Sequence, residues 1–107
     1  MPIQQMLLGT GSAVATKTYV DDVFSTFLYT GNATARSINN GIDLSGKGGL
    51  VWLKNRESSF HHTLFDTVRG ATKILRSSSD LAETTNSQTL SAFNNNGFSL
   101  GTDSMVN

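Results

Sequence analysis

Two adjacent histidines followed by an acid form the only cluster in the chain whose residue types could bind a metal ion. They are His61, His62 and Asp66. Adjacent side chains in an extended strand point to opposite faces, so the two imidazoles would not easily reach one ion. No further ligand converges with them, and the chain has no cysteine. We therefore expect no metal site and no cofactor, and we interpret the histidine pair as part of a surface loop.

Hydrolytic chemistry also lacks its usual sequence signals. Serines are abundant, but none lies in a Gly-x-Ser-x-Gly motif that would expose a nucleophile beside a base. No pair of carboxylates stands out for glycoside hydrolysis. The glycine clusters at 9–11 and 46–49 lack the Gly-Lys-Ser/Thr ending of a phosphate-binding loop. The sequence predicts a protein that is not an enzyme.

Two groups of charged and amide side chains suggest structural roles instead. Asp80, Glu83 and Asn86 offer oxygen ligands, but their spacing matches no ordered calcium loop. Asp66 and Arg69 are three residues apart and flank a Thr-Val pair. We expect these two to form a local ion pair, or a side-chain-to-backbone bond, that fixes a turn.

Two aromatic residues are candidates for stacking against a sugar ring. Trp52, the only tryptophan, and Tyr29 could contribute to a contact surface of this kind. However, Trp52 lies in the stretch Leu-Val-Trp-Leu-Lys, between two aliphatic residues. We therefore expect Trp52 to pack in the core, with glycan contact as the alternative.

The elements that position these residues must suit an unusual composition. Ser, Thr, Gly and Asn make up 45 of 107 residues, and they favour turns, loops and edge strands over long helices. Eight basic and eight acidic side chains cancel without clustering, so we expect no nucleic-acid partner. No apolar run is long enough to span a membrane, and the amino terminus lacks the features of a signal peptide. Zero net charge fits a protein that works inside an assembly.

Two regions follow from the apolar pattern. Residues 1–16 contain isolated apolar side chains, Ile3, Met6, Leu7 and Leu8. This stretch is either a disordered chain end or an extended arm that docks on another subunit, and we expect the docking arm because free apolar side chains are unfavourable in water. Residues 17–107 are expected to form one β-rich, sandwich-like domain. It would begin with a helical turn at 18–23, capped by Thr18 and Asp21.

The expected strands alternate with turn signals rich in Gly and Asn. The most convincing one holds Trp52, and the last two form a hairpin around Asn94–Gly97. The polar stretch 77–89 is expected to be a loop. The expected strands are 24–30, 42–44, 50–54, 63–66, 71–76, 90–93 and 97–100. The expected shared core contains Phe24, Phe27, Leu50, Trp52, Leu53, Phe65, Ile74, Phe93 and Phe98.

Four stretches carry a resemblance to a known family: VFSTFLYTGN, INNGIDLSGKGGLVWLKNR, HTLFDTVRGATKIL and LSAFNNNGFSLGTD. Together they resemble tail-associated proteins of phages that infect cyanobacteria and marine bacteria. The resemblance implies a β-sandwich of the concanavalin A or laminin-G type, and marks Asp-Thr-Val-Arg-Gly as a structural corner. Members of that family usually continue past the point that matches Asn107. We therefore expect the sheets to be completed by partner chains.

The resemblance implies a structural virion protein, assembled in the host cytoplasm. Its expected role is the amino-terminal, tail-attaching part of a tail fibre, with other tail proteins as partners. A homo-oligomer, most plausibly a trimer, would supply the missing sheet contacts. Two alternatives stay open: a carbohydrate-binding module that recognises a host surface glycan through Trp52 and Tyr29, and a capsid decoration protein.

Overall fold

The structure, a computed structural model, describes residues 17–107, so the docking arm with Ile3, Met6, Leu7 and Leu8 lies outside it. The described part of the chain contains two short helices, α1 (Val20–Val23) near its start and α2 (Leu44–Lys47) between the first two strands. The remaining elements are strands β2 (Arg36–Asn39), β3 (Leu50–Leu53), β4 (Thr63–Asp66), β5 (Lys73–Arg76), β6 (Thr84–Thr85), β7 (Leu90–Asn94) and β8 (Gly97–Leu100).

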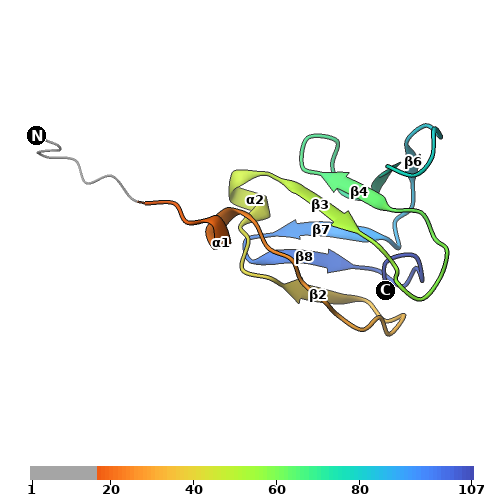
Figure 1. Cartoon of the computed structure of the whole chain (residues 1–107), viewed down its shortest axis with the longest axis horizontal. Helices are drawn as coiled ribbons and strands as arrows, with labels where there is room; N and C mark the ends of the chain where they lie inside the picture. The colour runs from red at the N-terminus through yellow and green to blue at the C-terminus, as the bar shows by residue number, and fades with distance from the viewer. Residues whose placement is uncertain (1–16) are drawn as a thin grey trace, which may run out of the picture.

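The strands form two antiparallel sheets, which Figure 1 shows one above the other. One sheet has the strand order β2-β8-β7, and the other has the order β3-β4-β5-β6. The short connections between β3, β4 and β5 and between β7 and β8 are those of antiparallel neighbours. The expected all-β, sandwich-like fold is therefore confirmed.

Each sheet turns one face of apolar side chains toward a shared core. Along β3 the exposed and buried positions alternate, with Val51 and Leu53 inside, as the two-residue period of a strand requires. Residues from α2 and from the carboxy-terminal turn close the two ends of the cluster. The core consists of Ile38, Leu44, Val51, Leu53, Phe65, Ile74, Leu90, Phe98, Leu100 and Val106.

The predicted closing hairpin is present, and it also positions β2. The turn between β7 and β8 ends at Gly97, which has a φ of 154°. A Cβ atom there would lie 1.9 Å from the carbonyl oxygen of Ile38 on the adjacent strand β2. Glycine is therefore needed at this position because the backbone of β2 approaches it too closely for any side chain.

The carboxy-terminal turn holds the chain that leads into β2. The Asn107 side chain donates to the carbonyl oxygens of Thr34 and Gly101, both at 2.7 Å, and accepts from the amide of Asn32 at 3.1 Å. The Asn107 carbonyl accepts from the amide of Ala33 at 3.1 Å. These bonds join residues 32–34 to the sandwich without any strand pairing.

Several predicted elements differ from the structure. The expected strand 24–30 is absent: the segment is extended but has no partner strand in the described chain. The expected strand at 42–44 is replaced by α2, because the Asp43 side chain accepts from the amide of Gly46 at 2.8 Å and caps a helical turn. Two strands were not predicted: β2, and the two-residue β6, which lies within the stretch 77–89 that was expected to be a loop.

The amino-terminal helical turn is present with a different cap. Its N-cap is Tyr19, whose amide donates to the carboxylate of Asp22 at 2.9 Å, in place of the expected Thr18 and Asp21.

The expected core was wrong at four positions and right at most others. Phe24, Phe27, Leu50 and Trp52 are exposed, whereas Leu53, Phe65, Ile74 and Phe98 are buried, and Phe93 packs partly against the core. Trp52 alternates with buried Val51 and Leu53, so strand geometry places its indole on the opposite face of the sheet.

Replacing Phe65 by alanine should lower the free energy of unfolding by about 3–5 kcal/mol, because the ring has no exposed surface and would leave a cavity. Trp52→Ala should lower it by only about 1 kcal/mol or less, since the side chain is exposed. Urea denaturation of the two variants measures the difference. Equal losses would show that Trp52 belongs to the core after all.

Candidate assembly and recognition surfaces

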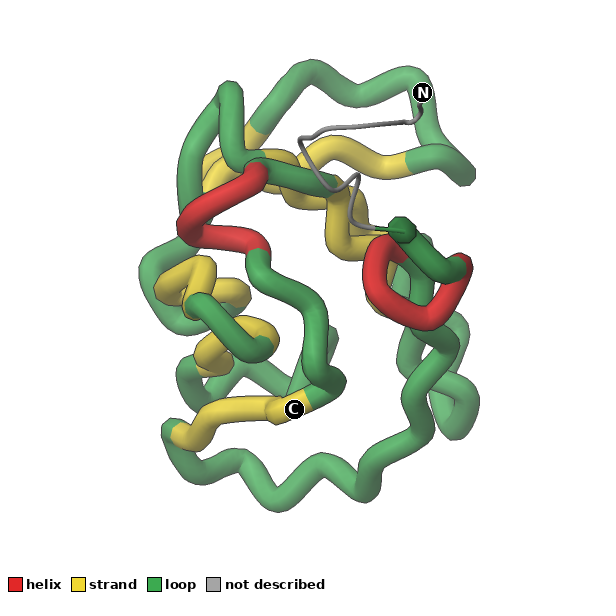
Figure 2. The backbone as a smooth tube through the Cα atoms, turned by 90° about the vertical axis from the view of Figure 1, so that its left-hand side faces the viewer, coloured by secondary structure: helices red, strands yellow, loops and turns green. Residues whose placement is uncertain are grey.

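The described chain begins with a run of large apolar side chains that the domain leaves uncovered. We call residues 19–28 the apolar segment. It passes through α1 and continues as extended chain, and Figure 2 shows it running down one side of the molecule toward β2. Its exposed apolar side chains are Tyr19, Val20, Val23, Phe24, Phe27 and Leu28. Six exposed apolar side chains within ten residues make the segment a candidate interaction surface.

The backbone that follows α1 is also without partners in the described chain. Between residues 25 and 31, no backbone amide or carbonyl is hydrogen-bonded to another described backbone group. Val, Phe, Thr and Tyr in this stretch favour extended structure. The segment thus has strand composition and extended geometry, and both its backbone and its apolar side chains are free to contact another chain.

A second exposed apolar surface lies on the outer face of the four-stranded sheet. Trp52 on β3 is the cross-strand partner of Leu64 on β4, and Leu64 is the partner of Leu75 on β5. Directly paired residues lie on the same face, so the three side chains form a row across the sheet. Leu50, two residues before Trp52, extends it along β3. We call these four residues the outer row.

The indole of Trp52 contacts His62 at its edge, and the rest of the side chain is largely exposed to solvent. Its Nε1–H donates to Nδ1 of His62 at 3.0 Å, and the two rings meet edge to face with centroids 5.7 Å apart. The side chain is nevertheless 61% exposed. His61 interacts separately, with Ser78 at 2.9 Å. The two histidines thus support different neighbours, and His62 orients the tryptophan.

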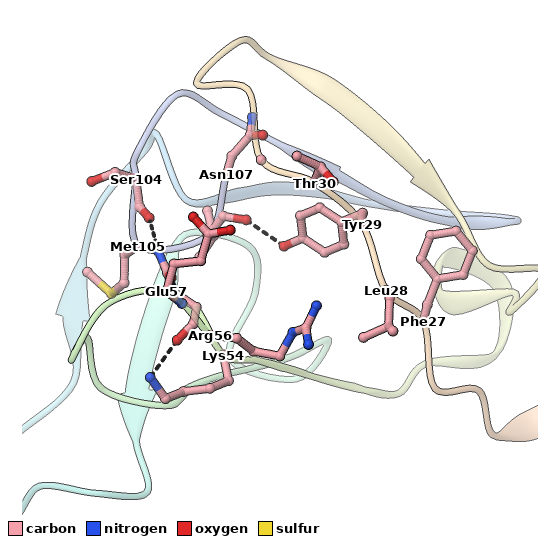
Figure 3. Close-up of a pocket in the computed structure, with 13 residues that line it drawn as sticks. Phe27, Leu28, Tyr29, Thr30, Lys54, Arg56, Glu57, Ser104, Met105 and Asn107 are labelled. Carbon is pink, nitrogen blue, oxygen red and sulfur yellow. Dashed lines mark hydrogen bonds between the residues drawn. The ribbon is translucent and has the colours of Figure 1, made fainter.

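Tyr29, the other candidate for glycan contact, lies in a different place. It lines a groove of about 510 Å³ between residues 27–31, residues 54–57 and residues 104–107 (Figure 3). Its hydroxyl donates to the carbonyl of Val106, and the guanidinium of Arg36 stands 5.1 Å from its ring centroid. Burial raises the pKa of the Tyr29 hydroxyl, although the charge of Arg36 opposes that rise. Trp52 does not line this groove, so the structure does not bring the two aromatic residues into one site.

The expected ion pair between Asp66 and Arg69 is confirmed, and it lies at a corner of the four-stranded sheet. The Arg69 side chain donates from Nε to Asp66 at 2.7 Å and from Nη1 to Glu83 at 3.1 Å. It also donates to the carbonyls of Leu64 and Lys73. The hydrogen bond from the backbone amide of Arg69, followed by that from its guanidinium, lowers the pKa of Asp66. One side chain therefore ties β4, β5 and the chain before β6 together.

Other candidate ligands are engaged separately. Glu83 binds Arg69, and Asn86 donates to Asp103 at 2.7 Å, so these two members of the Asp80–Asn86 group do not converge. Within residues 17–107, no group of three or more His, Asp or Glu side chains could hold a metal ion. Over the same residues, no helix has the length and apolar character needed to cross a membrane.

Leu64 and Leu75 were not predicted to belong to a surface. Each is next to a buried residue, Phe65 or Ile74, and this alternation is the only sign in the sequence that they face away from the core. Alternation separates the two faces of a strand, but it does not say which apolar positions of different strands lie side by side.

Comparison with known proteins adds a family but no activity. The model of a domain of unknown function (DUF7483) matches residues 20–107. Neither the curated proteins nor the solved structures contain a match to this chain.

The lowered pKa of Asp66 predicts a pH-dependent contribution to stability. A carboxylate with a lower pKa in the folded state stabilises the fold above its unfolded pKa of about 4, and this stabilisation is lost as the pH falls through the folded value. Asp66→Asn should therefore melt at a lower temperature than the wild type at pH 7, with the difference shrinking below pH 4. Thermal melts from pH 7 to pH 2.5 measure this, with exposed Asp80→Asn as the control. A constant difference across the range would contradict the assignment.

Proposed function

We propose that this chain, which belongs to the DUF7483 family of domains of unknown function, is a non-catalytic structural protein of a phage virion that assembles through its apolar segment. In the fuller form of the proposal, it is the tail-attaching part of a tail fibre and works as a homo-oligomer in contact with other tail proteins. The phage setting rests on the resemblance of the four sequence stretches to tail-associated proteins.

The observation that carries the assembly role is the exposure of residues 19–28. Six large apolar side chains in ten residues are exposed beside a core that is already filled by other residues. A stable protein interface buries roughly 800 Å² per partner, and several large apolar side chains exposed along one segment supply surface of the kind that such an interface covers. Leaving that area in water is unfavourable, whereas covering it with a second chain stabilises both.

Charge also favours association between copies. The chain has no net charge at pH 7, so no long-range repulsion opposes contact between identical subunits. Ser25, Thr26 and the carboxylates of Asp21 and Asp22 lie among the exposed apolar residues, and they would supply polar groups to the rim of such an interface.

One observation favours a second candidate function, the recognition of a host surface glycan. Trp52 is exposed and held in place by His62, as an aromatic platform for a sugar ring would be. In that role Trp52 would act alone, because Tyr29 lies in a separate groove and its hydroxyl is already engaged. Titration of dilute protein with soluble oligosaccharides, followed by Trp52 fluorescence, tests this candidate directly.

The assembly role predicts that polar substitutions in the apolar segment weaken association. The wild-type chain should sediment as an oligomer at micromolar concentration, and the double variant Phe24→Ser, Phe27→Ser should dissociate with a dissociation constant raised at least about tenfold. Both side chains are exposed in the single chain, so their loss should leave the fold intact. Analytical ultracentrifugation over a concentration series measures the effect.

The matched control is Val68→Ser, which removes an isolated apolar side chain that is 96% exposed at the turn between β4 and β5. This variant should assemble like the wild type. A wild-type chain that stays monomeric at every concentration would refute the assembly role, as would equal weakening by both variants.

A further inference from the structure

The outer row is the second apolar surface of the chain, and its position on the sheet indicates what could cover it. Trp52, Leu64 and Leu75 lie side by side across three strands, and Leu50 lies next to Trp52 along β3. Neighbouring strands are about 4.8 Å apart, so the row spans roughly 10 Å. A row of one tryptophan and three leucines suits an apolar protein segment better than a sugar. A sugar site needs polar groups around the aromatic ring on which the sugar stacks.

We propose that the outer row of one copy is the docking site for the apolar segment of a second copy. This inference rests on the proposed assembly role of that segment. Within one described chain the segment is exposed, and so are Leu50, Trp52 and Leu75 of the row, while Leu64 is half-buried. The segment of a chain therefore does not cover its own row. Between two chains, the apolar segment of one copy and the outer row of the other would cover each other's apolar side chains.

The dimensions of the two surfaces agree. Residues 24–28 are extended and follow directly on α1, and five extended residues span roughly 13–17 Å. That length is sufficient to cross the row while Phe24 and Leu28, which are four residues apart and lie on one face of the extended chain, contact the leucines. Because residues 25–31 make no hydrogen bond to other described backbone, the segment can lie on the sheet face without giving up existing bonds.

The charges beside the two surfaces are also complementary. The segment carries the exposed carboxylates of Asp21 and Asp22 near its start. The outer row is flanked by Lys73, two residues before Leu75, whose ammonium donates to the hydroxyl of Thr85. Lys54, two residues after Trp52, adds a second positive charge there, although its ammonium already donates to the carbonyls of Asn55, Ser58 and Phe60. The Asp66, Arg69 and Glu83 network at the remaining corner combines two negative charges with one positive charge. Opposite charges at the rim would orient the incoming segment more than they would tighten it.

A contact between two different surfaces is head-to-tail, and it has a structural consequence. Such contacts build either closed rings or open filaments, unlike contacts in which the same surface meets itself. A ring that closes after three subunits would give the trimer expected for a fibre-like protein. In such a ring, the apolar segment of each subunit would contact the outer row of the next.

The single tryptophan makes this contact directly observable. Trp52 is solvent-exposed in the isolated chain and would be covered in the assembly, so its fluorescence maximum should move to shorter wavelength as concentration rises. The shift should follow the same concentration dependence as the sedimentation of the oligomer. Assembly without any shift would overturn this inference while leaving the assembly role of the segment in place.

A mixing experiment identifies which surfaces meet. One variant, Phe24→Ser with Leu28→Ser, removes the two exposed side chains on the docking face of the segment but keeps the row. The other, Leu50→Ser with Leu75→Ser, lacks the row but keeps the segment, and it changes two exposed residues, so the fold should persist. Each variant alone should be monomeric, and far-ultraviolet circular dichroism checks that both are folded. Mixed together, they should form a one-to-one complex, because one intact copy of each surface remains.

The remaining outcomes decide against the inference. Self-association of the row variant alone would indicate that segments pair with segments. Failure of the mixture to associate, although the wild type does, would show that the row and the segment do not meet. A Trp52 shift that appears only on addition of soluble oligosaccharide, with the protein monomeric, would identify the row as a glycan site. A wild-type chain that never associates would remove the proposed assembly role together with this inference.

Discussion

The rest of the structure depends on one constraint, the single core that the two sheets share, and Phe65 lies within it. Its ring, on an inner strand of the four-stranded sheet, has no exposed surface and belongs to a core shared with β2, β7 and β8. Two thin sheets can exclude water only by committing one face of each strand to that shared core. The commitment determines the direction of every other side chain on those strands, and it sends Leu50, Trp52, Leu64 and Leu75 outward together.

Polar contacts hold the parts that the core does not reach. Arg69 joins three neighbouring segments at one corner through Asp66, Glu83 and two backbone carbonyls. At the other end, the Asn107 side chain fixes the loop before β2. A chain rich in Ser, Thr, Gly and Asn has loops that its apolar core does not cover, and such bonds hold these loops in place. Many of its large apolar residues lie outside the core, and the functional proposal is therefore based on them.

The two exposed surfaces differ in what they offer to a partner. Residues 25–28 of the apolar segment make no hydrogen bond to other described backbone, whereas the outer row lies on paired strands and His62 orients its Trp52. An unpaired extended element and a preformed sheet face in the same chain are a suitable combination for assembly between copies. Family membership neither requires nor opposes this reading, since the matching domain has no assigned function.

The sequence by itself determined the elements whose signals are local. Turn residues and two-residue alternation located β3, β4, β5 and the β7–β8 hairpin, and three-residue spacing located the Asp66–Arg69 pair. Only the tertiary structure decided which apolar face of β3 is buried, since both faces of Leu-Val-Trp-Leu are apolar. It also decided that residues 24–30, despite their strand composition, form no strand within the chain. A strand exists only where another strand satisfies its backbone, and the partner of a strand is a property of the whole fold.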